Sequence, residues 1–371
     1  MKKTNTDNKN IHSTLILGVT SLVAFFIFFI NSDIAIEYMK KGLKLCVTSV
    51  IPSLFPFMVI SELIVKNSLS YKIGRILRYP MRVLFRVSEA GGCAFLLGTL
   101  CGFPIGAKSA VSMYDSGVIG KGELERLLCF CNNPGSAFII SAVGISLFGN
   151  RRIGILLYVC IILSSIILGI FTNVFFNKTE KEPLRGAYVI TPSKDSISIF
   201  TSSVASSAVS MLTVCAYVVF FSSLVGCISS FLHSLSAPIA LRSLVFGFFE
   251  MTSGVSIAAD VHNIELSLIL CALFTAWSGL SVHFQIITIC SGRGISFKRY
   301  FISKAIQGII CALLMGISIY FLFPDILSIT EDVFMQNGDG LTLYNAALYC
   351  FSFFMSSIAV ITIGFIRKKR I

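Results

Sequence analysis

The chain has 371 residues, of which 55% are hydrophobic and only 13% are charged. Because soluble domains carry about a quarter charged residues, this composition excludes an ordinary soluble protein and predicts a polytopic membrane protein. The formal net charge of +12 does not indicate nucleic-acid binding, because the basic residues stand at the ends of apolar runs and form no basic face interleaved with aromatic side chains.

The N-terminal part is expected to hold a first transmembrane helix within residues 1–33. Its apolar run, 15–30, is longer than the hydrophobic part of a signal peptide, and no small-residue cleavage site follows it. An amphipathic lead-in over 34–45 precedes a second span over 45–65, which Pro52 and Pro56 should kink or break. Basic residues after this span predict a cytoplasmic segment: Lys66, Lys72, Arg75, Arg78, Arg82 and Arg86.

Residues 91–117 are apolar enough for a membrane but are interrupted at Gly102, Phe103, Pro104 and Gly106. A helix needs about 20 residues to cross a bilayer, and each limb beside the interruption is about half that length. We therefore expect a re-entrant hairpin with its tip near the midplane. Irregular backbone at that depth needs protein or a watery cavity around it, which makes the tip a candidate binding site.

The remaining segments repeat this order. A helix that begins at Lys121 should break at 132–136 and resume over 137–148, and a further span covers 153–176. A polar linker, 178–196, separates this first repeat, 34–177, from a second repeat, 197–323. The second repeat holds a long apolar run (197–232), a broken hairpin (240–260), a broken span (266–290) and a clean span (301–323). Residues 324–371 supply an acidic outer loop and a last span with a basic tail.

Charge orients these segments in the membrane. With both termini in the cytoplasm, the acidic loop falls outside, and a basic group falls inside: Arg293, Lys298, Arg299 and Lys304. A second group falls on the unexpected side: Lys40, Lys41, Lys44, Arg151 and Arg152. The two hairpins then enter from opposite sides. The expected fold is an all-α polytopic membrane protein with about eight transmembrane helices and two re-entrant hairpins in two inverted repeats, a common plan of secondary transporters.

The first candidate site lies in the second limb of the first hairpin. Lys108, Ser112 and Asp115 fall on one face of that limb. A lysine beside a helix N-terminus suits an anion, and ionisable residues inside membranes are usually functional. We take the four tip residues, Lys108 and Ser112 as candidates for substrate binding, and Asp115 as a candidate for ion or proton coupling. The alternative is that Lys108 pairs with Asp115 or extends to the interface.

The other breaks supply further candidates. At 132–136, the unwound carbonyls and the side chains of Asn132, Asn133 and Ser136 suit a polar substrate or a small cation, or else hydrogen bonds between helices. Glu250 at the second tip could exchange a proton or neutralise Lys108 when the site is empty. Glu62 and Asp260 are expected near the interface and carry less weight. The remaining candidates for substrate binding are polar residues of the second repeat: Thr252, Ser253, Ser278, Ser281, His283 and Gln285.

No motif for an enzyme or a metal site appears. The 12 cysteines stand mostly singly in apolar segments, where packing explains them. The four histidines are dispersed, and no HExxH motif, GxSxG motif or pair of aspartates within spans occurs. We therefore expect no enzymatic reaction, no metal and no cofactor.

Four stretches carry a resemblance to a known family. They are IPSLFPFMVISELI (51–64), GTLCGFPIGAK (98–108), ERLLCFCNNPGSAFI (125–139) and VGISLFG (143–149). Together they resemble the stage V sporulation integral membrane proteins, which belong to the nucleoside-recognition gate domain superfamily and are distantly similar to the concentrative nucleoside transporters. The second half matches more in layout than in motif.

The resemblance implies a transporter that moves dipicolinic acid across the outer forespore membrane during sporulation. Lys108, Asn132 and Asn133 would then contact the substrate, a small, planar, aromatic dicarboxylate that is a dianion at neutral pH. The residues alone leave open a transporter of nucleosides or another small solute, and a non-transporting sporulation scaffold or receptor. The lipid bilayer is the expected surrounding, nucleic acid is not an expected partner, and association into a homo-oligomer stays open.

Overall fold

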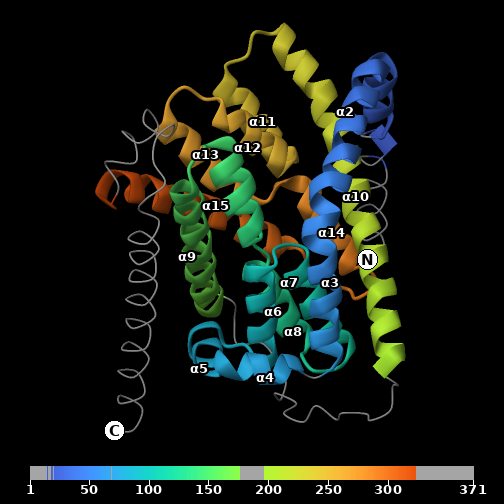
Figure 1. The fold of residues 1–371 in the computed structure, drawn as a ribbon, viewed down its shortest axis with the longest axis vertical. Coiled ribbons are helices and arrows are strands. Elements are labelled where there is room, and N and C mark those ends of the chain that lie inside the picture. The colour runs from blue at the N-terminus through green and yellow to red at the C-terminus, as the bar shows by residue number, and fades with distance from the viewer. Residues whose placement is uncertain (1–14, 16–17, 20, 68, 176–195, 323–371) are drawn as a thin grey trace, which may run out of the picture.

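The structure is a computed structural model that describes residues 15, 18–19, 21–67, 69–175 and 196–322. Within these ranges the chain forms helices and loops and no strand, as expected (Figure 1). The first half holds α2 (Ser32–Leu45), η1 (Cys46–Val50), α3 (Ile51–Lys66), α4 (Leu69–Ile76), α5 (Arg78–Pro80), η2 (Met81–Phe85), α6 (Glu89–Leu100), α7 (Ile105–Asp115), α8 (Lys121–Phe130), η3 (Phe138–Leu147) and α9 (Arg151–Phe175). The second half holds α10 (Ser196–Ser234), α11 (Ile239–Phe249), α12 (Met251–Ala259), α13 (Ile264–Trp277), α14 (Gly279–Ile289) and α15 (Lys298–Leu322). Most of the predicted linker and all of 324–371 lie outside the described residues.

Four helices of the described part of the chain are long and apolar enough to cross a membrane: Arg151–Thr172, Ser196–Leu232, Ile264–Ile289 and Lys298–Phe321. Two bent pairs raise this number to six if each counts as one span. One pair joins Ser21–Ile30 to Ser32–Thr48 at 98°, and the other joins Arg78–Phe85 to Glu89–Leu100 at 97°. The described residues therefore do not confirm the predicted eight spans. The expected second span, 45–65, is not among the candidates, because α3 has only 16 residues and crossing takes about 20.

The chain stays helical through the two prolines of α3, so the break expected there does not occur. A π-helical turn, η1, comes immediately before α3 instead, and Pro52 lies in the first turn of that helix. Because the helix runs on from η1 into α3, the π-turn adapts the backbone to the N–H that Pro52 lacks. Pro56 lies inside α3, which packs along α10.

Both predicted hairpins are present as pairs of short helices that pack on each other, α6 with α7 and α11 with α12. Each pair meets through glycines. A Cβ on Gly98 of α6 would lie 2.8 Å from the Cα of Gly106 on α7, and a Cβ on Gly254 of α12 would collide with Gly247 of α11. In Figure 1, α6 and α7 occupy the lower half of the molecule above α4 and α5, whereas α11 and α12 lie in the upper half.

The turn of each hairpin lies against a break in a later helix. In the first half, the turn residue Gly102 has a φ of +90° and contacts Gly135, and the Ser136 hydroxyl donates to the Leu100 carbonyl at 3.2 Å. In the second half, Gly279 has a φ of +73° and approaches the N of Met251, and the Trp277 indole N–H donates to the Phe248 carbonyl at 3.2 Å. The breaks at 132–136 and at Ser278 are therefore present as predicted.

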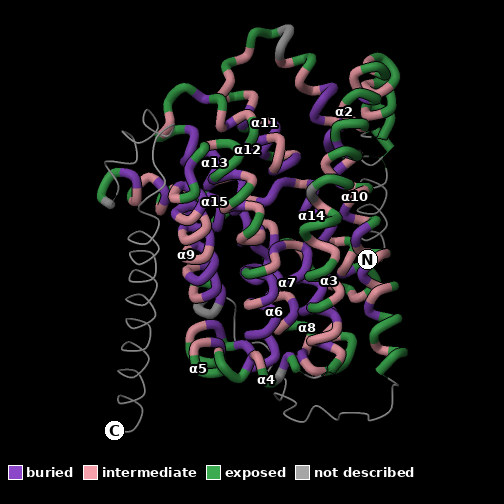
Figure 2. Tube along the Cα trace, in the orientation of Figure 1, coloured by how far each residue is buried: buried purple, intermediate pink, exposed green. Residues whose placement is uncertain are grey.

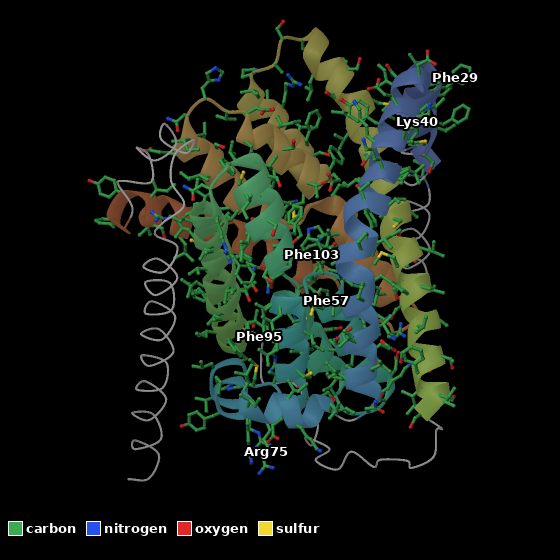
Figure 3. The ribbon with its side chains drawn as sticks, in the orientation of Figure 1. Phe29, Lys40, Phe57, Arg75, Phe95 and Phe103 are labelled. Atoms are coloured by element: carbon green, nitrogen blue, oxygen red, sulfur yellow. The ribbon has the colours of Figure 1, made fainter. Side chains whose placement is uncertain are left out.

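Burial separates an inner layer of helices from an outer layer. Figure 2 shows buried residues concentrated in α6, α7 and α13 and many exposed residues along α2 and α10. The outer residues include large apolar side chains such as Leu212 on α10 and Tyr320 on α15, which are 70% and 77% exposed. Lipid is the surrounding that such faces suit. At the centre, Phe103 of the first tip packs against two apolar cores, one around α6–α8 and one around α9, α12, α13 and α15 (Figure 3).

The two basic groups near the N-terminus lie at opposite ends of the molecule. Figure 3 places Arg75 at one end and Lys40 at the other, so Lys40 does not share a side with the basic segment that follows α3. Lys40 is one of the residues that the sequence-based topology already placed on the unexpected side by the charge rule.

Candidate functional site

Lys108 is buried in α7, with 6% of its surface exposed. Its Nζ lies 3.7 Å from Glu62 Oε2 on α3 and donates a hydrogen bond of 3.2 Å to the Ser207 hydroxyl on α10. The partner of Lys108 is therefore Glu62. The suggested pairings with Asp115 and with Glu250 were wrong.

Glu62 joins Lys108 to a second lysine. The Glu62 side chain is buried, and its Oε1 lies 3.4 Å from the Nζ of Lys66, one turn further along α3. Lys66 also donates to the Ser202 hydroxyl at 3.2 Å. We call Glu62, Lys66, Lys108, Ser202 and Ser207 the Lys108 cluster. Two lysines face one carboxylate in it, which leaves one positive charge without a partner among the described residues.

The expectation that placed Glu62 near the interface missed this burial. A glutamate and a lysine at i and i+4 form a surface pair on many helices, so the local pattern did not distinguish a buried from an exposed location. The signal that could have found Glu62 is its position inside an otherwise apolar run, where ionisable residues are usually functional.

Asp115 lies at the far end of α7 and pairs with Arg293, in the loop that follows α14. Arg293 Nε donates to Asp115 Oδ1 at 2.7 Å and Nη2 donates to Oδ2 at 2.6 Å. These hydrogen bonds raise the pKa of Arg293 above its ordinary value. Asp115 is 46% exposed in this pair, and Ser112, one turn earlier, is half-buried. The pair joins the first hairpin to the second half of the chain at the end of α7 away from the hairpin tip.

A second polar cluster surrounds the break at 132–136. Lys304 Nζ on α15 donates to the Asn132 carbonyl at 2.8 Å and to Gln307 Oε1 at 2.7 Å. Gln307 Nε2 donates to Asn133 Oδ1 at 2.8 Å, and Asn133 Nδ2 donates to the Ser165 hydroxyl on α9 at 3.3 Å. We call these five residues the Lys304 cluster. In this cluster Lys304 and Gln307 of the second half hydrogen-bond to the unwound segment of the first half.

Lys304 was predicted on the cytoplasmic side, which stays a prediction, but its burial inside the protein was not foreseen. Its side chain is fully buried, and no carboxylate among the described residues pairs with it. The reason is that α15 begins at Lys298 and packs against α8, which places Lys304 inside the protein. Lys304 and Gln307 stand three residues apart in an apolar helix, and that spacing was the available signal.

Glu250 caps the helix that follows it. Its carboxylate accepts hydrogen bonds from the N–H groups of Thr252 at 3.0 Å and Ser253 at 2.7 Å and from the Thr252 hydroxyl at 2.5 Å. A negative side chain at an N-cap satisfies free N–H groups and interacts well with the helix dipole. The tip residues Glu250, Thr252 and Ser253 are thus bound to one another.

The candidate polar residues of the broken span are buried; Ser278 and Gln285 bond within the span, and His283 bonds to α15. Ser278 has a φ of +79° at the break, and Gln285 Nε2 donates to the Ser281 hydroxyl at 3.4 Å. His283 Nδ1 and the Tyr300 hydroxyl share a hydrogen bond of 2.7 Å. None of these contacts joins the broken span to Lys108.

The tip residues of the first hairpin form a tight turn. The peptide bond between Phe103 and Pro104 is cis, and a Cβ on Gly106 would collide with the Cys131 carbonyl. The tip therefore packs against the segment that the Lys304 cluster holds. Most of the sequence-predicted residues lie in two places. One is the first tip with the break at 132–136, and the other is the second tip with the break at Ser278. Lys108 instead points toward α3 and α10.

Two other places carry no such chemistry. A groove of about 500 Å³ between α13 and α15 is lined by apolar side chains such as Leu273 and Phe321 and by none of the candidate residues. Among the described residues no group of three or more His, Cys, Asp or Glu side chains could hold a metal ion.

Comparison with known proteins adds one relative. No family model matches the chain, and no solved structure matches it significantly. Among curated proteins, the sporulation integral membrane protein YlbJ of Bacillus subtilis (strain 168) is 29% identical over an alignment 331 positions long, and the alignment covers 79% of this chain and 81% of the relative. This supports the predicted resemblance to sporulation membrane proteins, whereas similarity to nucleoside-recognition proteins stays a prediction. Over most of its length, the chain is similar to an integral membrane protein of sporulation.

Proposed function

We propose that this protein is a membrane transporter that moves a small aromatic dicarboxylate, dipicolinate, across the outer forespore membrane during sporulation, with both termini in the cytoplasm. The link to sporulation follows from the name of the relative. The proposal includes no enzymatic reaction and no cofactor.

The observation that carries the proposal is the unbalanced positive charge of the Lys108 cluster. Lys66 is 29% exposed and in part solvated, whereas Lys108 is buried, so the cost of the extra charge falls mainly on Lys108 and an anion that binds beside it reduces that cost. Lys108 lies in the first half of α7, where the positive end of the helix dipole adds to the attraction. The Ser207 and Ser202 hydroxyls next to the two lysines can turn to donate to carboxylate oxygens.

The arrangement of the hairpins supports a transport cycle. Each hairpin turn lies against a break in a later helix, and the two hairpins occupy opposite halves of the molecule (Figure 1). Gly106 and Gly254 both lie where the limbs of their hairpins meet. We propose that the halves are inverted repeats, and that movement of one against the other opens the site to each side in turn.

A binding experiment with the purified full-length protein tests this proposal. Dipicolinate should raise its thermal unfolding temperature, and uridine should not, because a nucleoside brings no charge to the lysines. Lys108→Gln should abolish the shift, whereas Lys40→Gln, at an exposed lysine at the other end of the molecule, should keep it. Spores that carry Lys108→Gln at equal protein level should accumulate less dipicolinate. A shift with uridine alone, or normal accumulation in the variant, would overturn the proposal.

A further inference from the structure

We propose that Glu62 is the site of proton coupling, so that one proton travels with each dicarboxylate dianion. This inference rests on the proposed function and specifies how the same site is driven. It gives Glu62 the role that the sequence suggested for Glu250 or Asp115.

The location of Glu62 is the first observation. It is buried between α3, α7 and α10 and contacts both lysines of the Lys108 cluster. Few other charged groups approach from these elements. On α7 the remaining one is Asp115, which pairs with Arg293, and α10 carries no Asp, Glu, Lys or Arg. The neighbouring helix α4 contributes Lys72 and Arg75, and both are exposed.

The other candidate carboxylates are already engaged. Glu250 accepts three hydrogen bonds at the start of α12, and Asp115 is held by two hydrogen bonds from Arg293 in an exposed pair. Neither contacts Lys108. Glu62 is therefore the carboxylate whose surroundings change when a ligand binds to Lys108.

Charge balance gives the number of protons. Without ligand, the cluster carries one net positive charge, because Lys66 and Lys108 face Glu62 alone. A dianion that binds to Lys108 converts this to one net negative charge, and a buried unbalanced charge is unfavourable. One proton restores neutrality.

Glu62 is the group that receives the proton. The ligand takes over the Nζ of Lys108, which now lies 3.7 Å from Glu62 Oε2, and Glu62 keeps only Lys66, whose Nζ it shares with Ser202. The proton comes from the water on the side from which the ligand enters, and binds a Glu62 carboxylate oxygen. When the ligand leaves on the other side, Lys108 returns to Glu62 and displaces the proton into the water there. No other bond is formed or broken.

Vesicles that contain only the purified protein provide the test. Uptake of labelled dipicolinate is measured together with internal pH, with and without an imposed pH gradient. The wild type should move about one proton per dianion, so that one pH unit of gradient supports up to about a tenfold accumulation. Glu62→Gln should bind dipicolinate without moving protons, and Glu62→Asp should keep the coupling. Asp115→Asn should still move about one proton per dianion, whatever its rate of uptake.

Each outcome separates the two proposals. Dipicolinate uptake without proton movement in the wild type would overturn the role of Glu62 and leave the transport function in place, and so would proton movement that persists in Glu62→Gln. Uptake that requires sodium and does not depend on the pH gradient would also reject the coupling role of Glu62. A wild-type protein that neither binds nor moves dipicolinate would reject the proposed function and this inference together. The wild-type measurement needs no variant, so a misfolded Glu62→Gln protein would not prevent the test.

Discussion

The ion pair between Glu62 and Lys108 should stabilise the empty protein by an amount that a double-mutant cycle can measure. At 3.7 Å, two unit charges attract by about 4.5 kcal/mol if the effective dielectric constant is about 20. Desolvation of both groups reduces the net value, and the competing contact of Glu62 with Lys66 reduces it further. We therefore expect a coupling energy of about 2 kcal/mol between Glu62→Gln and Lys108→Gln. Lys108→Gln alone should cost about 3 kcal/mol, because it leaves Glu62 buried with one partner fewer.

The assay is unfolding of the purified protein in mixed micelles, with the free energy of unfolding obtained for the wild type, both single variants and the double variant. The matched control is the same cycle on Glu37 and Lys41 of α2. That pair is shorter, at 2.7 Å, but both side chains are about 60% exposed, and its coupling should fall within about 0–1 kcal/mol.

Two results would refute the reasoning. A coupling energy below about 0.5 kcal/mol would mean that Glu62 and Lys108 do not interact in the empty protein. A coupling at Glu62 and Lys108 no larger than that of the exposed control would mean that burial does not strengthen the pair. Saturating dipicolinate should also reduce the coupling energy, because the ligand replaces Glu62 beside Lys108. An unchanged coupling energy would mean that the ligand does not bind at this ion pair.

Three further variants test the rest of the structure. Glu250→Ala should lower the free energy of unfolding by about 1–2 kcal/mol through loss of the α12 cap, and Glu250→Gln should leave the pH dependence of transport unchanged; a lost pH response would return the coupling role to Glu250. Gly106→Ala should destabilise the protein by about 1–3 kcal/mol, because its Cβ would meet the Cys131 carbonyl. Gly122→Ala on α8, where nothing lies within 4 Å, should be neutral or stabilising. Equal effects of the two variants would contradict the tight packing of the tip. Lys304→Met should reduce thermal stability, since the Asn132 carbonyl and Gln307 Oε1 would each lose a buried donor worth about 1–3 kcal/mol. Lys298→Met at the exposed start of α15 should not reduce it. A more stable Lys304→Met protein would show that relief of the buried charge outweighs the lost hydrogen bonds.

Local features of the chain could be predicted because their cause lies within a few consecutive residues. Two short apolar limbs around Gly102 and Pro104 cannot form one spanning helix, so the break before α7 and the hairpin followed from length alone. The breaks at Asn132 and Ser278 followed in the same way from short runs of polar and small residues. A single proline was less informative, since the helix continues through Pro56.

The partners of the ionisable residues could not be predicted, because they are distant in the sequence. Ser207 stands 99 residues from Lys108, and Gln307 stands 174 residues from Asn133. Charge counting assigned Lys304 to the cytoplasmic side and gave no information on its burial, whereas packing of α15 against α8 buries it.

The sequence by itself determined that the chain is helical, apolar on its outer faces and broken at defined points. Composition and the spacing of Gly, Pro and Asn act over a single helix, and no distant contact is needed to produce them. Only the tertiary structure decided which charges meet. It pairs Lys108 with Glu62 between α3, α7 and α10, assigns Glu250 to its own helix, and uses Lys304 to hold the break of the other half. The physical reason is that a buried charge takes the partner that helix packing brings within reach, and packing is a property of the whole chain.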